Sequence, residues 1–351
     1  MTPRRAGTTL APAMDLFQLT RALIDIDSTT GRERAVGDFL FEHLRILGQR
    51  TGGKVERMPV EWGRFNVLAT WGEPVVTLST HMDTVPPFLP SSEDTEHIRG
   101  RGACDTKGIL AAMIRAIEEL LAERVYNFGL LVVVGEETDS VGAQVANRSP
   151  RGSRFLINGE PTENRLALGS KGALYLALEA EGRAAHSAYP ELGVSAIDRL
   201  LEALARLHAL PLPTDPVLGE TTVNVGTITG GRAPNVVADR ARAEVMVRTV
   251  GETEELRRSL FETVQAVPGV RVAEVRETPA VHLGSLPGFE TTVVKYTTDI
   301  PRLPAWGRPF LLGPGSIHVA HTPDERIPKR ELAEAVEHYK RMVRILLEPA
   351  A

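Results

Sequence analysis

Short apolar runs alternate with amphipathic stretches along the first half of the chain. Apolar residues recur at helical spacing in Leu16–Ile26, in Arg32–Leu47 and in the alanine-rich Ile109–Ala122, which predicts three helices. Runs rich in β-branched and aromatic residues predict strands at Phe65–Trp71, Val75–Leu78, Phe128–Val134 and Phe155–Asn158. We expect the first two strands to be neighbours, because only three residues separate them. Strands that alternate with helices favour a parallel sheet.

A different pattern begins near Lys171 and predicts a second domain. Strands and helices follow in the order βαββαβ, at 174–180, 193–208, 222–229, 241–248, 254–267 and 270–276. This order is that of a ferredoxin-like unit, and its size suits a small inserted domain. A further strand at Phe310–Leu312 and an amphipathic helix at Lys329–Leu347 then return the chain to the first domain.

The expected fold class is therefore α/β, with a mixed, mainly parallel sheet flanked by helices and an inserted ferredoxin-like domain. We expect the first domain to consist of residues 1–171 and 284–351, and the inserted domain of 172–283. A length of 351 residues agrees with two domains. We expect residues 1–12 to form a loose tail, because no apolar segment follows Arg4 and Arg5 as it would in a secretory signal.

Composition narrows the class of protein. The chain is 42% hydrophobic and 24% charged, as in ordinary globular proteins, and no apolar run is long enough for a membrane span. A net charge of -5 without a basic tract argues against nucleic acid as a partner. The one cysteine, Cys104, excludes an intramolecular disulfide and is compatible with the cytoplasm. We interpret it as a small buried residue rather than a thiolate ligand.

Acidic and imidazole side chains follow the predicted strands. They are His81 and Asp83, Glu136 and Glu137, and Glu160, while Asp105 lies in a glycine-rich loop just before the helix at 109. The carboxyl ends of parallel strands meet at one edge of a sheet, so these groups are expected to converge. Imidazole and carboxylate suit divalent metal ions, and the acids would repel one another without a cation. If the backbone stays extended, Glu136 and Glu137 point in opposite directions.

Six motifs, taken together and in this order, resemble a family of zinc-dependent exopeptidases and deacylases. The family includes acetylornithine deacetylase, succinyl-diaminopimelate desuccinylase and glutamate carboxypeptidase. The motifs are Ser79–Asp83, Gly100–Gly108, Gly135–Glu137, Asn158–Pro161, Ala185–Ser187 and Ala320–Glu325. The resemblance extends from about Leu16 to Leu347. It implies the zinc-exopeptidase fold, with the inserted domain serving as a dimerisation lid.

The resemblance also implies a site for two divalent metal ions, which would be Zn²⁺, with Co²⁺ or Mn²⁺ also compatible with the ligand types. Its ligands would be His81 and Glu160 for one ion, Glu137 and His321 for the other, and Asp105 as a bridge between them. His318 is the rival of His321, which we prefer because it directly precedes the Thr-Pro-Asp-Glu pattern.

Roles for other residues follow from the same resemblance. Asp83 would hold the far nitrogen of His81, and Glu136 would activate a metal-bridged water to attack an amide carbonyl. His186, Asn235 and Arg248 would bind substrate, with His186 reaching the active site of a partner in a homodimer formed through the inserted domain. For Arg248 the alternative of an ordinary exposed charge at a strand end stays open. The resemblance further implies a cis peptide between Asp105 and Thr106.

The leading hypothesis is a cytoplasmic amidohydrolase that removes an acyl group from an N-acylated amino acid, in the manner of acetylornithine deacetylase. The alternative is a di- or tripeptidase or a carboxypeptidase that uses the same metal site on short peptides. An alternative of another class is a non-catalytic relative that binds an amino acid. Glu136 and all five expected ligands are present, which favours an enzyme.

Overall fold

The computed structural model describes residues 14–61 and 63–348, and the expected N-terminal tail lies outside them. The chain divides into two compact units. Unit 1 consists of residues 1–165 and 302–351, and unit 2 of residues 166–301. The second unit thus starts and ends at different residues from the 172–283 expected for the inserted domain.

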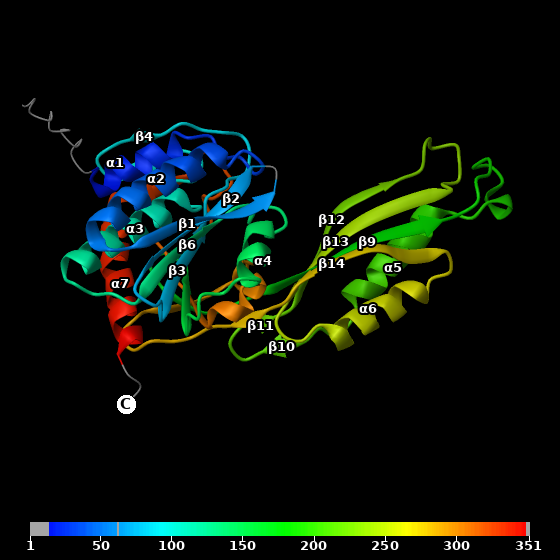
Figure 1. Ribbon diagram of the computed structural model, residues 1–351. Helices are drawn as coiled ribbons and strands as arrows, with labels where there is room; N and C mark the ends of the chain where they lie inside the picture. Colours follow the sequence, from blue (N-terminus) through cyan, green and yellow to red (C-terminus); the bar gives the residue numbers. More distant parts are fainter. Residues whose placement is uncertain (1–13, 62, 349–351) are drawn as a thin grey trace, which may run out of the picture. The chain divides into compact units, whose positions relative to one another are not determined.

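Unit 1 is built on a six-stranded sheet in the order β1-β2-β6-β3-β7-β17. Figure 1 labels β1, β2, β3 and β6 of this sheet. The strands are β1 (Lys54–Glu61), β2 (Arg64–Trp71), β3 (Val76–His81), β6 (Phe128–Val133), β7 (Phe155–Asn158) and β17 (Arg308–Leu311). The pairings β3–β6, β3–β7 and β7–β17 are parallel, and β1–β2 and β2–β6 are antiparallel. The predicted mixed, mainly parallel sheet is confirmed.

One predicted neighbour relation was wrong. Strands β2 and β3 follow each other in sequence, but β6 lies between them in the sheet. The connection Gly72–Pro74 therefore does not form a hairpin, since β3 runs parallel to β6 while β2 runs antiparallel to it. A short connection implies a hairpin only when both strands belong side by side, and here the apolar β6 inserts between them.

Helices cover both faces of this sheet. They are α1 (Leu16–Ile24), α2 (Arg34–Thr51), α3 (Lys107–Ala122), α4 (Val141–Asn147) and α7 (Lys329–Leu347). Helix α4 packs on the face that carries Met58, Leu68, Leu131 and Val133. Helix α2 packs on the opposite face, where Gly37 meets the ring of Phe65. Because side chains alternate along a strand, Phe65 and Leu68 necessarily point to opposite faces.

Helix α3 is the central helix of unit 1. It contacts α1, α7 and β3, and 12 of its residues are buried, including Ile109, Met113 and Ile117. A helix that is apolar on nearly all sides belongs in a core. The helix begins at Lys107, two residues after Asp105, so a deeply buried helix fixes the backbone next to that residue.

Smaller elements complete unit 1. A three-stranded sheet contains β4 (Ser92–Glu93), β5 (His97–Arg99) and β18 (Arg326–Pro328), in the order β18-β5-β4. A short 3₁₀ helix spans Pro304–Trp306. The pairing of β5 with β18 connects the glycine-rich loop after Arg99 to the segment that follows His321.

Unit 2 contains the predicted ferredoxin-like βαββαβ order. Its elements are β9 (Gly172–Glu181), α5 (Ala196–His208), β12 (Thr222–Gly230), β13 (Arg240–Thr249), α6 (Glu254–Gln265) and β14 (Val270–Thr278). The strands form an antiparallel sheet in the order β12-β13-β9-β14. One face of this sheet packs against α5 and α6 in an apolar core that includes Leu176, Val245, Leu200 and Leu260.

The remaining elements of unit 2 form two small sheets and two turns. The strands are β8 (Leu166–Ser170), β10 (Thr214–Asp215), β11 (Gly219–Glu220), β15 (Val281–His282) and β16 (Thr291–Val294). The 3₁₀ helices span Pro190–Leu192 and Ile300–Arg302, the latter reaching the boundary with unit 1. Thr298 and Asp299, just before the second of these 3₁₀ helices, are buried.

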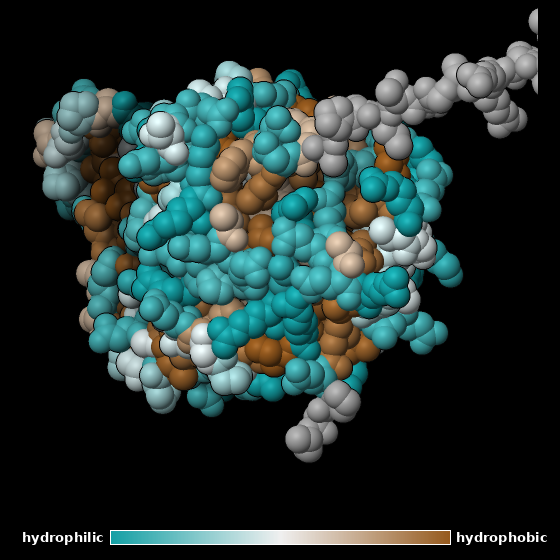
Figure 2. Space-filling model, turned by 90° about the vertical axis from the view of Figure 1, so that its left-hand side faces the viewer, coloured by the Kyte–Doolittle hydropathy of each residue, from teal (hydrophilic) through white to brown (hydrophobic). Residues whose placement is uncertain are grey.

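Hydrophilic residues cover most of the face of unit 1 seen in Figure 2, with small apolar areas between them. This agrees with the exposed charged residues of α2 and α7, such as Arg45 and Arg330. Within residues 14–61 and 63–348, no helix is both long and apolar enough to cross a bilayer.

Gly108 should be intolerant of a side chain. A Cβ atom at this position in the first turn of α3 would overlap the carbonyl oxygen of Ala103, in the loop that carries Asp105. We expect Gly108→Ala to destabilise the protein by about 1–3 kcal/mol, as overpacking of a core does, and to lower the melting temperature. Gly226→Ala is the control, since its nearest neighbour would be Glu244 O at 3.7 Å. Equal melting temperatures for the two variants would contradict this interpretation.

Candidate metal centre

The predicted polar residues lie where the three parallel strands end. His81 is the last residue of β3, Glu137 lies in the turn after β6, and Glu160 comes two residues after β7. Because β3 lies between β6 and β7 and all three run the same way, their carboxyl ends share one edge of the sheet. Asp105 reaches this edge from the loop before α3, and His321 from the loop between β17 and β18.

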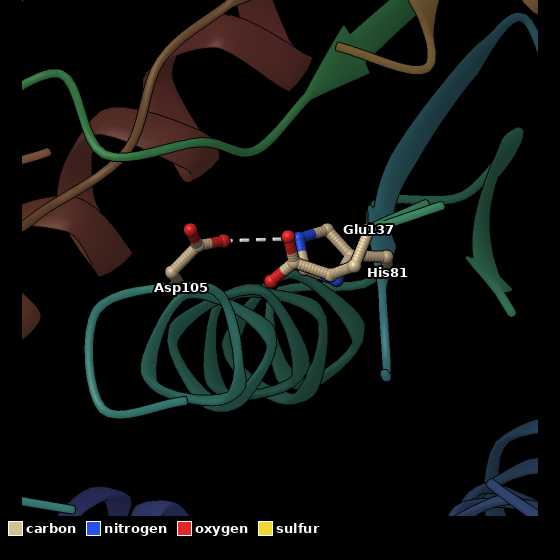
Figure 3. A group of neighbouring side chains, drawn as sticks. All are labelled: His81, Asp105 and Glu137. Atoms are coloured by element: carbon tan, nitrogen blue, oxygen red, sulfur yellow. Dashed lines mark hydrogen bonds and ion pairs between the residues drawn. The ribbon is translucent and has the colours of Figure 1, made fainter. Parts of the chain in front are cut away.

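The Asp105 carboxylate lies between two imidazoles. Its Oδ1 is 3.0 Å from His81 Nε2, and its Oδ2 is 3.2 Å from His321 Nε2. His321 Nε2 also lies 3.1 Å from the carboxylate of Glu137. Figure 3 shows the side chains of His81, Asp105 and Glu137 directed toward one another. One carboxylate thus offers one oxygen to each of two histidines.

Glu160 lies on the His81 side of this arrangement. Its Oε1 is 3.9 Å from His81 Nε2, and its side chain is almost fully buried. Glu137 is equally buried, whereas about half of the His321 side chain is exposed. The five residues therefore divide into a buried half with His81 and Glu160 and a more accessible half with Glu137 and His321, joined by Asp105.

Strong mutual electrostatic effects accompany this packing. Burial opposes charging of His81, but its bonds to Asp105 and Asp83 outweigh burial and raise the pKa of His81 well above its ordinary value. The hydrogen bonds to Asp105 and Glu137 raise the pKa of His321 to about 10. Burial alone would raise the pKa of Asp105, yet hydrogen bonds with the two imidazoles lower it. The acids therefore create a negative potential that favours a cation.

These donors fit a metal centre. Ligand atoms of His81, Asp105 and Glu137 all lie within 4.8 Å of one another. Among the described residues, Asp105 and Glu137 form ion pairs with imidazoles only, so no lysine or arginine neutralises them. Imidazole and carboxylate are the nitrogen and oxygen ligands of zinc and similar ions, and a metal ion would replace the protons that the histidines otherwise hold.

Asp83 contacts more than the sequence suggested. His81 Nδ1 lies 3.0 Å from the backbone carbonyl of Asp83 and 3.6 Å from its carboxylate. The Asp83 carboxylate accepts hydrogen bonds from the backbone N–H groups of Glu136 and Glu137, at 3.1 and 3.2 Å, and from the hydroxyl of Thr30. Asp83 therefore fixes the turn after β6 as well as facing His81.

The backbone at Glu136 and Glu137 forms a turn. The sequence predicted that these two side chains point in opposite directions only if the backbone is extended, and this condition is not met. The turn forms because Gly135, with φ of 79°, leaves the strand and both following N–H groups are directed to Asp83. Glu136 is half-buried, and its negative charge contributes to the raised pKa of His81, which places it close to the centre.

His321, and not its rival, faces the carboxylates. His318 is exposed, and its charge acts on Glu163 instead. His321 has φ of 64°, a left-handed conformation that is uncommon for residues other than glycine and is typical of functional sites. The Asp105–Thr106 peptide is cis, as the resemblance implied. Cys104 is buried against Glu325, and burial raises the pKa of its thiol.

All three expected substrate-binding residues belong to unit 2, and two of them, His186 and Asn235, lie in adjoining loops. The loops of His186 and Asn235 are joined by a hydrogen bond from Ser187 N–H to Asn235 O and by a β-bridge between His186 and Val236. Ala188 N–H donates to His186 Nδ1 at 3.1 Å, which leaves Nε2 as the ring's hydrogen-bond donor when the ring is neutral.

Arg248 lies at the end of β13, on the face of the sheet opposite α5 and α6. It is half-buried, and burial lowers its pKa. Within the described chain it forms no ion pair, unlike Arg242 on the same face, which pairs with Glu179 at 3.0 Å. An unpaired, half-buried guanidinium has a free fork for a carboxylate.

Known proteins resemble this chain over nearly its whole length. A family model described as a peptidase dimerisation domain matches residues 168–270. A peptidase M20 domain-containing protein of Schizosaccharomyces pombe is 40% identical over 95% of this chain and 86% of its own. A probable carboxypeptidase of Aspergillus fumigatus is 38% identical over 97% of this chain and 88% of its own.

Solved structures share the fold. A tripeptidase from Staphylococcus aureus has a TM-score of 0.78 at 23% identity and covers 94% of this chain and 97% of its own. An M20 family metallo-carboxypeptidase from Sulfolobus solfataricus has a TM-score of 0.74 at 16% identity, with 95% and 99% covered.

Proposed function

The chain belongs to the M20 peptidase family, and we propose that it is a metal-dependent carboxypeptidase that acts on short peptides. The observation that carries the proposal is the Asp105 carboxylate shared by two imidazoles. Relatives 37% to 40% identical include several named as probable carboxypeptidases, which favours a peptidase over a deacylase. The deacetylase reading from the sequence is not specifically supported by these relatives and is retained as an outcome of the assay.

We propose the five clustered residues as ligands. His81 and Glu160 would hold one ion, Glu137 and His321 the other, and Asp105 both, in agreement with the short distances within each group. When bound, two such ions would lower the pKa of water and stabilise the charge that develops on an amide oxygen. We propose Zn²⁺, with Co²⁺ or Mn²⁺ able to replace it.

Glu136 is the proposed general base. Its backbone is held without metal, because the N–H groups of Glu136 and Glu137 both donate to Asp83. Its carboxylate would accept a proton from the attacking water and deliver that proton to the amine that leaves. Asp83 would act as a positioning residue, since its carboxylate accepts from the N–H groups of this turn and its backbone carbonyl lies 3.0 Å from His81 Nδ1.

Unit 2 would supply the residues that bind substrate. We propose that Arg248 binds the terminal carboxylate of a peptide, because its guanidinium is half-buried and without an ion pair in the described chain. His186 would donate from Nε2 to the carbonyl oxygen of the scissile amide, and Asn235, held in the adjoining loop, would bind the same substrate.

We also propose a homodimer formed through unit 2. Among the described strands, β12 lies at an edge of the unit 2 sheet, and Ile228 on it is 51% exposed. Leu201 on α5 is 49% exposed in the same unit. An exposed edge with apolar side chains commonly pairs with another chain. His186 would then serve the active site of the partner.

The proposed activity predicts a pattern of cleavage. Zinc-loaded protein should release the C-terminal residue from N-blocked dipeptides but not from their C-terminal amides, and Glu136→Gln should lower kcat by about 10²–10⁴-fold without loss of bound metal. Chromatography of the released amino acids measures this, with N-acetylornithine and other N-acetyl amino acids as a second panel.

Preference for N-acetyl amino acids would replace the carboxypeptidase with the deacylase. Cleavage only of peptides with a free amino terminus would indicate an aminopeptidase. Binding of amino acids without turnover of either panel would favour the non-catalytic alternative.

Arg248→Met should weaken recognition of the carboxylate. We expect KM for N-blocked dipeptides to rise on the order of tenfold to a hundredfold, because a charge-assisted hydrogen bond is lost. Arg242→Met is the matched control, since Arg242 lies on the same strand face but is paired with Glu179. Steady-state kinetics of both variants distinguishes the roles, and an equal change in KM for both would oppose the assignment of Arg248.

Mixing two inactive variants tests whether His186 acts across a dimer. Glu136→Gln and His186→Ala should each be nearly inactive alone. If His186 serves the partner, each mixed dimer contains one site with both residues intact, and about a quarter of wild-type activity should return after subunit exchange. Sedimentation velocity establishes the dimer, and a mixture that stays as inactive as its components would refute action in trans.

A further inference from the structure

A buried ion pair lies beside the metal centre without belonging to it. Arg101 Nη1 is 2.5 Å from Glu325 Oε2, and the side chains are 2% and 0% exposed. Neither residue is among the proposed ligands or substrate-binding groups. Both nevertheless occur in the segments that carry ligands, Arg101 four residues before Asp105 and Glu325 four residues after His321.

Glu325 holds the loop of Asp105 through its other oxygen. Oε1 accepts hydrogen bonds from the backbone N–H groups of Gly102 at 2.9 Å, Asp105 at 3.3 Å and Cys104 at 3.4 Å. The first is of ordinary length and the other two are long. Three N–H groups directed at one carboxylate oxygen give the loop a concave shape and fix the backbone of Asp105 itself.

Arg101 connects this loop to two others. Its Nη1 donates to the carbonyl oxygen of Thr322, next to His321, and its Nε to that of Pro87, in the segment that follows His81 and Asp83; both distances are 3.3 Å. The backbone N–H of Arg101 donates to Leu89 O at 3.0 Å in the same segment. The guanidinium of Arg101 therefore joins its own loop, which carries Asp105, to two other segments, the one that follows His81 and the one that follows His321.

We propose that Arg101 and Glu325 form a positioning pair that sets the distance between Asp105 and His321 before metal binds. The proposal rests on the proposed metal-dependent function. Glu325 accepts a hydrogen bond from the backbone of Asp105, and Arg101 donates one to the carbonyl of Thr322, next to His321. The ion pair between Arg101 and Glu325 joins these two anchoring points. The pair thereby positions the chain around the more accessible half of the centre, in which about half of the His321 side chain is exposed.

A role in stability alone does not account for this pair. A buried ion pair is often no more stabilising than apolar residues of similar size, because both charges lose their hydration. The distinctive contribution of the pair is to orient the loops, because the Glu325 carboxylate accepts hydrogen bonds from three backbone N–H groups and from a guanidinium at the same time. Groups that orient metal ligands typically change metal affinity by about 10–100-fold when they are removed.

The test compares three variants of the full chain with the wild type. Glu325→Gln keeps the shape but puts an amide against Arg101. The double variant Arg101→Met and Glu325→Met removes both charges, so that no buried charge is left uncompensated. Lys340→Met is the control, because it removes another largely buried cation of unit 1, which pairs with Glu119 at 2.8 Å between α7 and α3 and with Glu337 at 2.9 Å.

Two measurements separate positioning from stability. Zn²⁺ affinity is determined by competition with a chromophoric chelator, and the exchange rates of the Gly102, Cys104 and Asp105 amides are determined by NMR. We expect Glu325→Gln and the double variant to lose about 10–100-fold in affinity for one ion, with faster exchange at these amides. The double variant should recover melting temperature relative to Glu325→Gln but not affinity, and Lys340→Met should lose melting temperature alone.

Wild-type affinity for both ions in the double variant would overturn the proposal. Loss of affinity in Lys340→Met in proportion to its loss of melting temperature would also overturn it, because the effect would then be general destabilisation. If Glu325→Gln does not fold, the double variant decides. A wild type that binds no Zn²⁺ would instead overturn the proposed function, and the positioning role with it.

Discussion

The centre of this protein is governed by the cost of bringing several carboxylates together out of water. Asp105, Glu137 and Glu160 converge at the carboxyl ends of parallel strands, and each has a largely buried side chain. Like charges at this spacing require a compensating cation. In the absence of metal, a proton on the ring of His81 or His321 provides positive charge, and the neighbouring carboxylates therefore raise the pKa of both rings. Divalent ions would meet the same requirement and add the capacity to activate water.

The surrounding loops are held largely by hydrogen bonds to acids that are not themselves ligands. Asp83 binds the turn of Glu136 and Glu137, and Glu325 binds the loop of Asp105. Each carboxylate accepts from successive backbone N–H groups, so the ligands are oriented by the chain itself. This agrees with the general rule that partners behind the ligands orient a metal site. The proposed general base benefits equally, because its backbone is fixed without metal.

Local pattern was sufficient for most of the fold. Strand β7 and helix α7 were predicted with their observed bounds, and the ferredoxin-like order of unit 2 is confirmed. Strand β1 was missed because it is a mostly exposed edge strand with charged residues and Pro59, and α4 because seven residues are too few to show a helical period. The order of β2, β6 and β3 depends on pairing between distant segments, which local pattern does not contain.

Some residues of the candidate site could be predicted from the sequence pattern, some only from the family resemblance, and some not at all. The strand-end acids followed from the parallel sheet, but the choice of His321 over His318 came from resemblance, since spacing alone does not distinguish them. The contact of Asp83 with the turn at Glu136 and the Arg101–Glu325 pair were not predicted, because each depends on where loops meet in space. The most direct test is a crystal structure of the zinc-loaded protein with anomalous data at the zinc edge. We expect two peaks, one within about 2.0–2.2 Å of each carboxylate oxygen of Asp105. A single peak, or ions bound by His318 instead of His321, would contradict the proposed centre.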